Sequence, residues 1–138
     1  MDITIDPSHV FAYNKLVDPR THLRLISLEG HDKTTQIVTV SIITVPTHDV
    51  PHYHAVSYTW GERTSGEQIW MNGDRAGHLH VQANCATVLR QLHHFSTSEY
   101  YWIDAICINQ SDTEEKECQV AMMGWIFMHA ECVLACVG

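Results

Sequence analysis

The chain has 138 residues, with 8 Lys and Arg against 16 Asp and Glu, which gives a formal net charge of −8. That length is typical of one domain, and 45% apolar residues are too many for a disordered chain. An acidic chain without a basic stripe argues against nucleic-acid binding. No apolar run reaches the roughly 18–20 residues of a membrane span. The acidic start, Met1-Asp2-Ile3-Thr4-Ile5-Asp6, lacks the basic and then apolar order of a signal peptide, so we expect none. We therefore expect a cytoplasmic protein without membrane contact, whose five cysteines are thiols.

The first half of the chain predicts extended structure. Alternating apolar residues or runs of β-branched residues predict three strands. These strands cover residues 22–28, 36–45 and 53–60. Two shorter extended segments follow, at 68–71 and 78–81, on either side of Asn72-Gly73-Asp74. Since Asn-Gly is the strongest short signal for a hairpin, we expect a hairpin at this point.

The second half begins with a helix and a strand. The helix is expected to run from a cap at Asn84 to about His94. Its inner face carries Ala86, Leu89 and Leu92. Residues 101–108 are apolar except for Asp104, and they predict one strand.

A second helix and a last strand complete the chain. The capping box Ser111-Asp112-Thr113-Glu114 predicts a helix that runs to about His129. Its inner face carries Gln119, Met122 or Met123, Ile126 and Ala130. Residues 131–137 predict an apolar strand, whose edge is expected to attract another chain. This order predicts the α/β class, with a parallel βαβαβ core, additional antiparallel N-terminal strands and a hairpin.

Histidines and cysteines are the only candidate metal ligands that stand out. The pairs His52/His54 and His78/His80 each lie on one face of a possible strand, and such pairs can bind zinc. Neither pair has a Cys or carboxylate partner at a standard spacing, and the cysteines form no C-x-x-C motif. We expect no metal, although a His-rich metal-binding module stays open as a third hypothesis that a metal assay tests.

Three sequence blocks are too particular for generic packing. They are His54-Ala55-Val56-Ser57-Tyr58-Thr59-Trp60-Gly61, then Trp102-Ile103-Asp104-Ala105-Ile106-Cys107-Ile108-Asn109-Gln110 with Asp112, Glu115-Lys116 and Gln119-Val120, and finally Ile126-Phe127, Ala130, Val133 and Cys136-Val137-Gly138. Together these blocks resemble the heterokaryon incompatibility (HET) domain of filamentous fungi. The resemblance covers residues 22–138 and leaves 1–21 as an N-terminal extension.

The resemblance implies a role in fungal nonself recognition, in which HET domains trigger programmed death of the fused cell. We expect the domain to act by self-association or by binding a protein partner. The HET family also resembles TIR domains distantly, which implies a TIR-like core and, as the alternative, an enzyme that hydrolyses NAD. In the favoured register the catalytic glutamate of TIR enzymes would lie beyond Gly138. A register shifted by one strand makes Glu115 the nearest candidate.

Ligands of parallel α/β sheets bind beyond the carboxyl ends of the strands, where loops converge. A nucleotide such as NAD is a reasonable ligand there, because a glycine allows close approach, an arginine clamps phosphate and a helix start attracts anions. The candidate binding residues are Ser57, Trp60, Gly61, Arg63, Asn109, Gln110 and Asp112. An alternative interpretation is that Asn109, Gln110 and Asp112 only cap and brace a helix. In the same interpretation Trp60 and Trp102 are core residues.

Asp104 and Glu115 are the two candidate catalytic residues. A carboxylate inside an apolar strand must be paired or protonated, so Asp104 is expected to pair with Arg24 or Arg90 unless it is catalytic. Glu115 is expected on solvated helix surface unless the shifted register holds. Cys107 lacks a local base, which argues against a nucleophile.

Overall fold

The computed structural model describes residues 10–31, 34, 37–58 and 66–136. Seven strands lie within these residues: β1 (His22–His31), β2 (Val38–Pro46), β3 (His54–Tyr58), β4 (Glu67–Asn72), β5 (Gly77–Val81), β6 (Tyr101–Trp102) and β7 (Cys132–Cys136). The helices are α1 (Ala83–Phe95), α2 (Asp104–Cys107), α3 (Thr113–Ala121) and α4 (Met123–His129). None of the helices within these ranges is long and apolar enough to span a membrane.

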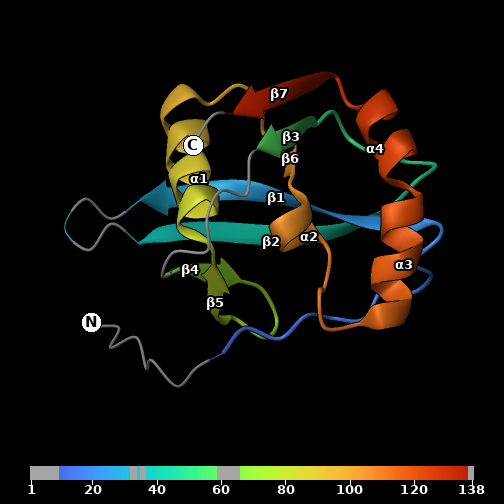
Figure 1. Cartoon of the computed structure of the whole chain (residues 1–138), viewed down its shortest axis with the longest axis horizontal. Coiled ribbons are helices and arrows are strands. Elements are labelled where there is room, and N and C mark those ends of the chain that lie inside the picture. The colour runs from blue at the N-terminus through green and yellow to red at the C-terminus, as the bar shows by residue number, and fades with distance from the viewer. Residues whose placement is uncertain (1–9, 32–33, 35–36, 59–65, 137–138) are drawn as a thin grey trace.

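The described strands form one mixed sheet, in the order β5-β4-β2-β1-β6-β3-β7 (Figure 1). β1 and β2 form a long antiparallel pair, and β4 adds to β2 in parallel. On the other side, β3 pairs in parallel with both β6 and β7. A single register pair, Ile26 with Tyr101, joins β1 to β6. The α/β class is therefore confirmed.

The hairpin predicted around Asn72-Gly73 is confirmed, because β4 and β5 pair antiparallel across this turn. The strand predicted at 78–81, which precedes the first predicted helix, is β5, and it does not belong to the parallel group of β6, β3 and β7. This strand lies at the far edge of the sheet, whereas β3 takes the place between β6 and β7. Only long-range pairing decides that exchange, and local sequence does not encode it.

The single strand predicted over 101–108 is wrong. β6 ends at Trp102, and Asp104 starts the short helix α2. The buried residues Ile103, Ile106 and Cys107 follow helical spacing as well as they follow an apolar strand. A continuous apolar run of this length does not distinguish the two structures, which explains the error.

The helix predicted from residue 84 is confirmed as α1, although its cap is Gln82 rather than Asn84. Its buried residues are Cys85, Ala86, Val88, Leu89 and Leu92, at helical spacing against the sheet. The helix predicted over 111–129 is two helices, since α3 ends before Met122 and α4 begins after it. The cap of α3 is Asp112, one residue later than predicted.

The core reaches beyond the predicted domain boundary. Phe11 joins the buried apolar cluster and Leu16 is buried as well, so the described part of the segment before residue 22 packs on the domain.

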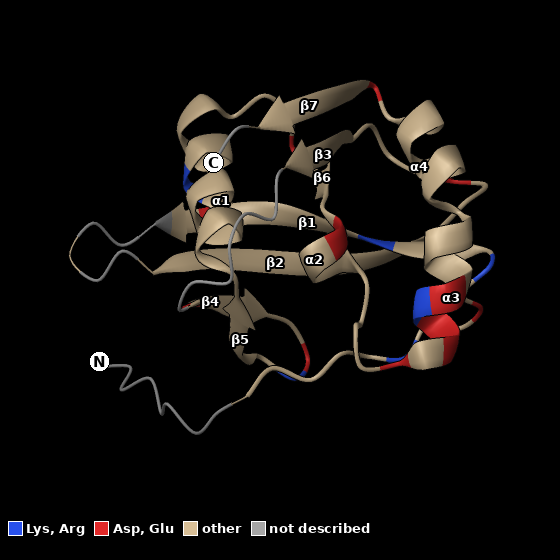
Figure 2. Ribbon diagram, in the orientation of Figure 1, with Lys and Arg blue, Asp and Glu red and all other residues tan. Residues whose placement is uncertain are grey.

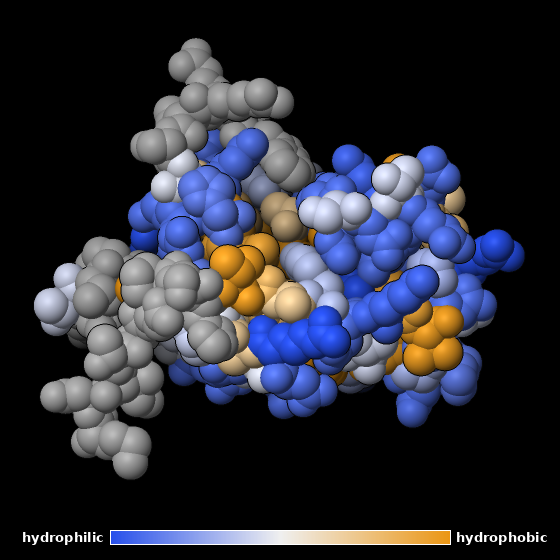
Figure 3. Space-filling model, turned by 90° about the horizontal axis from the view of Figure 1, so that it is seen from below, coloured by the Kyte–Doolittle hydropathy of each residue, from blue (hydrophilic) through white to orange (hydrophobic). Residues whose placement is uncertain are grey.

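The face beneath β5 is largely hydrophilic, with separate small apolar patches (Figure 3). β7 is the outermost described strand on the opposite side.

Leu89→Ala tests the packing of α1 on the sheet. Leu89 is fully buried, so its truncation is expected to lower the free energy of unfolding by about 2–5 kcal/mol. Val17→Ala is the control, because Val17 is exposed and its truncation is expected to change the value by less than about 0.5 kcal/mol. Urea denaturation of both variants measures the difference, and equal stabilities would contradict the placement of α1.

Candidate functional site

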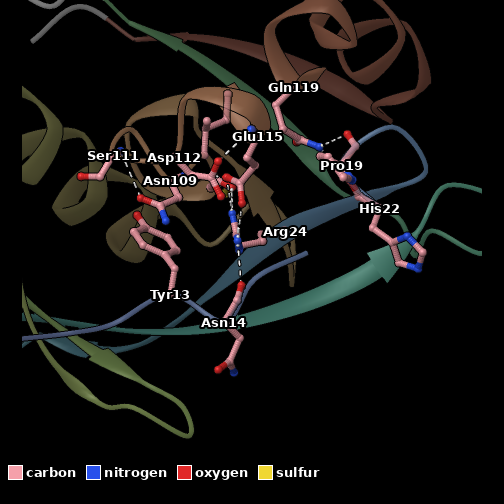
Figure 4. Close-up of polar contacts among 12 residues, drawn as sticks. Tyr13, Asn14, Pro19, His22, Arg24, Asn109, Ser111, Asp112, Glu115 and Gln119 are labelled. Carbon is pink, nitrogen blue, oxygen red and sulfur yellow. Dashed lines mark hydrogen bonds and ion pairs between the residues drawn. The ribbon is translucent and has the colours of Figure 1, made fainter. Parts of the chain in front are cut away.

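A buried ion pair joins Arg24 of β1 to Glu115 of α3 (Figure 4). Arg24 Nη1 donates to Glu115 Oε2 at 2.7 Å, and Nη2 donates to Oε1 at 2.6 Å. The two side chains are 2% and 3% exposed. Two parallel charge-assisted hydrogen bonds of this kind fix both position and orientation. The expectation that Glu115 lies on solvated surface is therefore wrong.

Three further backbone groups complete this ion pair. Arg24 Nη2 donates to the carbonyl oxygen of Asn14 at 2.8 Å, and Nη1 donates to that of Cys107 at 3.2 Å. The backbone N–H of Asn109 donates to Glu115 Oε2 at 2.6 Å. These bonds satisfy charges that burial would otherwise make very costly. Four segments of the chain thus meet at one ion pair.

The ring of Tyr13 covers this ion pair. The guanidinium carbon of Arg24 lies 4.8 Å from the centroid of the Tyr13 ring, which is a cation–π distance. The Tyr13 hydroxyl donates to the carbonyl oxygen of Ile106 at 2.6 Å. Burial raises the pKa of Tyr13 above its ordinary range, so the hydroxyl keeps its proton as a donor.

The loop between α2 and α3 uses its polar groups internally. Asn109 Oδ1 accepts from the backbone N–H of Ser111 at 3.1 Å, and Asp112 Oδ1 accepts from that of Glu115 at 3.1 Å. Gln110 Nε2 donates to the carbonyl oxygens of Asp104 and Ile108. This is the geometry of a capped and braced helix start. Acidic residues gather on α3 (Figure 2), and their charge disfavours an anion there.

Gln119 connects α3 to the chain just before and within β1. It is fully buried, as its inward spacing predicts, and its Nε2 donates to the carbonyl oxygens of Pro19 and His22, both at 2.8 Å. A buried amide must find such partners. α3 is therefore fixed to the β1 region at Glu115 and again one turn later.

The predicted pairing of Asp104 with Arg24 or Arg90 is wrong. Arg24 pairs with Glu115, and Arg90 pairs with Glu67 at 2.7 Å. Asp104 is half-buried at the start of α2. Burial raises its pKa, an effect that the backbone N–H of Ala105 partly offsets. The site holds this carboxyl group by backbone hydrogen bonds, with its proton retained to a higher pH than usual.

Sequence reasoning missed two neighbours of Asp104, namely Tyr58 and Cys85. Tyr58 ends β3, and its hydroxyl interacts with the buried thiol of Cys85 on α1. The pKa of Cys85 is raised to about 12, chiefly by burial and in smaller part by the charge of Asp104, while the interaction with Tyr58 opposes the rise. No spacing in the sequence signals this cluster, because its members come from three separate elements. Because Tyr58 is the last residue of β3, this cluster lies at the carboxyl end of that strand.

The buried thiols of Cys85 and Cys107 keep their protons in this environment. All five cysteines are free, as expected. Burial raises the pKa of Cys107 to about 12 as well, and Cys107 is fully enclosed. Since the thiolate is the reactive form, neither Cys85 nor Cys107 has the character of a nucleophile.

The other predicted binding residues are not brought into one described site. Ser57 is exposed on β3, opposite Ala135 of β7, and within the described residues no hydrogen bond joins it to the loop at 109–115. Trp60, Gly61 and Arg63 lie outside the described residues. Trp102 is fully buried in the core, where it packs edge-on against Phe127, as its core interpretation predicts.

Comparison with known proteins gives two findings. Residues 53–138 match the family described as "Heterokaryon incompatibility protein (HET)". Over 147 aligned residues the chain is 35% identical to "Heterokaryon incompatibility protein 6, OR allele" of Neurospora crassa, an alignment that covers 98% of this chain. The chain spans 22% of the length of that relative. No solved structure matches the chain.

Glu115→Gln tests the buried ion pair. It leaves the Arg24 guanidinium buried without a counter-charge, so we expect the free energy of unfolding to fall by about 3–5 kcal/mol. Glu67→Gln is the control, since it removes a half-exposed partner of Arg90 and is expected to cost less than about 1 kcal/mol. Urea denaturation measures both, and similar losses would contradict a special role for Glu115.

Asp104→Asn tests the burial of the half-buried carboxyl group. The pKa of Asp104 is higher in the folded state than the ordinary value of 3.8. The stability that protonated Asp104 contributes is therefore fully present below that pH and is lost as pH rises through the folded pKa. We therefore expect Asp104→Asn to be more stable than the natural chain at pH 7, with the difference shrinking toward pH 4. Thermal unfolding over this pH range measures the effect, and a gap that widens in acid would refute it.

Proposed function

Because the chain belongs to the heterokaryon incompatibility (HET) family, we propose that it is a nonself-recognition module of fungal heterokaryon incompatibility. Its family, which the sequence blocks had predicted, is confirmed. In the proposed role the domain acts in the cytoplasm as an effector of programmed cell death, through self-association or a protein partner. The observation that carries this proposal is the similarity of 98% of the chain to an incompatibility protein.

The strand β7 supports a role in association. It is the outermost described strand of the sheet, and none of its residues is charged. Edge strands of this kind attract other chains unless charges or prolines prevent it. A hollow between α1 and β7 is lined by Leu92, Phe95, Val133 and Leu134 among others, and Phe95 and Val133 are exposed. An apolar edge beside an apolar hollow favours binding of protein.

The environment of Glu115 also favours a binding module. Both oxygens of this carboxylate accept hydrogen bonds from Arg24, and one also accepts from the backbone of Asn109. A carboxylate that acts on a substrate must be within reach of it, whereas the Glu115 side chain is 3% exposed and already paired with Arg24. In the proposed function Glu115 is therefore a structural residue.

The alternative is a TIR-like, nucleotide-processing enzyme that hydrolyses NAD. One observation favours it: Tyr58 and Asp104 interact close to the carboxyl end of β3, within the parallel group of β6, β3 and β7. Ligands of parallel sheets bind at such ends. The raised pKa of Asp104 would also suit a general acid better than an ordinary carboxyl group does. In this alternative Asp104, rather than Glu115, carries the chemistry.

Expression of the chain in a compatible fungal strain tests cell death, and sedimentation of the purified chain tests self-association. Val133→Lys places a charge on the β7 edge, and Val120→Lys places one on α3 at matched exposure, since the two valines are 49% and 50% exposed. We expect Val133→Lys to lower both cell death and self-association in sedimentation, with Val120→Lys unchanged, because an edge charge opposes strand pairing.

Turnover of NAD by the purified chain distinguishes the alternative. The recognition module is expected to leave NAD unchanged even at concentrations where the chain self-associates. NAD loss that disappears in Asp104→Asn, with the melting temperature unchanged or higher, would overturn the proposal in favour of the enzyme. Cell death that is equal in the natural chain and both lysine variants would refute the role of β7.

A further inference from the structure

The strand β7 has a free edge among the described strands. It is last in the sheet order, and its five residues include no charge and no proline (Figure 2). Its register with β3 is regular from Cys132 to Cys136, so no bulge interrupts it. Charged residues, prolines and bulges are the usual protections of an edge strand against another chain. β7 has none of them, which leaves its edge open to pairing.

The sequence of β7 is nearly symmetric about its centre. It reads Cys-Val-Leu-Ala-Cys, with a cysteine at each end and Leu134 in the middle. When two copies of this strand pair antiparallel about Leu134, Cys132 of each copy lies opposite Cys136 of the other. Val133 likewise lies opposite Ala135, and Leu134 lies opposite the same residue of the second copy. Every position thus meets a residue of matching chemistry, which is the self-complementarity that a two-fold interface requires.

The charge of the chain restricts where two copies can meet. A formal net charge of −8 makes the copies repel each other, so contact costs least where neither surface is charged. The β7 strand is such a surface (Figure 2). A basic partner would instead be attracted to the acidic residues of α3. An uncharged edge therefore suits a second copy of this chain better than it suits a basic protein.

Helix α1 supplies apolar surface beside the β7 edge (Figure 1). Such support is needed, because an isolated pair of strands is at best marginally stable in water. A hollow of about 340 Å³ lies between α1 and β7, and Phe95, which lines it, is 70% exposed. A two-fold axis perpendicular to the sheet keeps α1 on the same face in both copies. The two hollows then lie on one face of the joined sheet, where burial of their apolar side chains stabilises the pair.

From this geometry we propose that two copies of the domain associate by antiparallel pairing of their β7 strands, centred on Leu134. The two sheets of seven described strands then form one continuous sheet. Backbone hydrogen bonds supply the affinity, and the matched side chains fix the register. The inference rests on the proposed recognition function, because it names the partner of the same β7 edge.

Disulfide cross-linking of the whole chain tests both the partner and the register. Opposite residues of an antiparallel pair have Cα atoms about 4.5–5.5 Å apart, a separation that a disulfide can bridge. Two variants are compared, Cys132→Ser and Cys136→Ser. Each also carries Cys118→Ser, which removes the other accessible thiol, because Cys85 and Cys107 are buried.

The two variants are oxidised with diamide, separately and as an equimolar mixture, and the remaining thiols are then blocked. We expect the mixture to form linked dimers, with up to about half of the chains linked, since random assortment makes half of the two-fold dimers mixed. Each variant alone is expected to stay unlinked, because its one β7 cysteine lies opposite a serine. Links within Cys132→Ser or Cys136→Ser alone, as strong as in the mixture, would refute the antiparallel register.

Sedimentation under reducing conditions gives a second measurement that needs no cross-link. The natural chain is expected to form dimers that Val133→Lys disrupts and that Val120→Lys, at matched exposure, leaves intact. A chain that stays monomeric, or a mixture that links no better than its separate variants, would overturn the proposal.

The dimer and the recognition function can fail separately. Cell death in the fungal strain without linked dimers would refute the pairing of β7 and leave the recognition function in place. Linked dimers without cell death would support the pairing and count against the recognition function.

Discussion

The burial of one positive charge organises this domain. A guanidinium ion without solvent needs a counter-charge and acceptors for its N–H groups, and Arg24 finds them in Glu115 and in the carbonyl oxygens of Asn14 and Cys107. Those partners come from the segment before β1, from the end of α2 and from α3. Each of these segments must be in place before the charge is satisfied. The ion pair therefore selects one arrangement of the chain among those that apolar packing alone would allow.

The requirement to satisfy this buried charge also explains which polar residues have a structural role. The polar loop at 109–115 carries the residues that look most like a ligand site, yet most of its polar groups serve the ion pair and the start of α3. Polar groups with less fixed roles lie elsewhere. Asp104 lies near the carboxyl end of β3, while His52, His54 and Glu131 lie at the amino end. Polar side chains outside the ion pair thus lie at both ends of the parallel group.

The sequence predicted local features well and long-range ones poorly. β1, β2, the β4–β5 hairpin, α1 and the buried Gln119 follow from periodicity and turn residues, which act over a few positions. The partner of Arg24 could not be predicted, because it lies 91 residues away and no spacing rule connects the two. The strand expected over 101–108 failed since its apolar run suits a strand and a short helix alike. Tyr58 and Cys85 were missed because their contact with Asp104 exists only after folding.

The brevity of β6 has a mechanical consequence. It divides the sheet into a group of β5, β4, β2 and β1 and a group of β6, β3 and β7, which share the single register pair of Ile26 with Tyr101. Because so few backbone hydrogen bonds join the two groups of strands, side-chain contacts must hold the groups in place relative to each other. Arg24, on β1 of the first group, donates hydrogen bonds to Cys107 and Glu115, which lie on the segment between β6 and β7. The rigidity of the domain thus depends on the Arg24–Glu115 ion pair, which connects the two groups of strands near the point where the sheet has the fewest backbone hydrogen bonds.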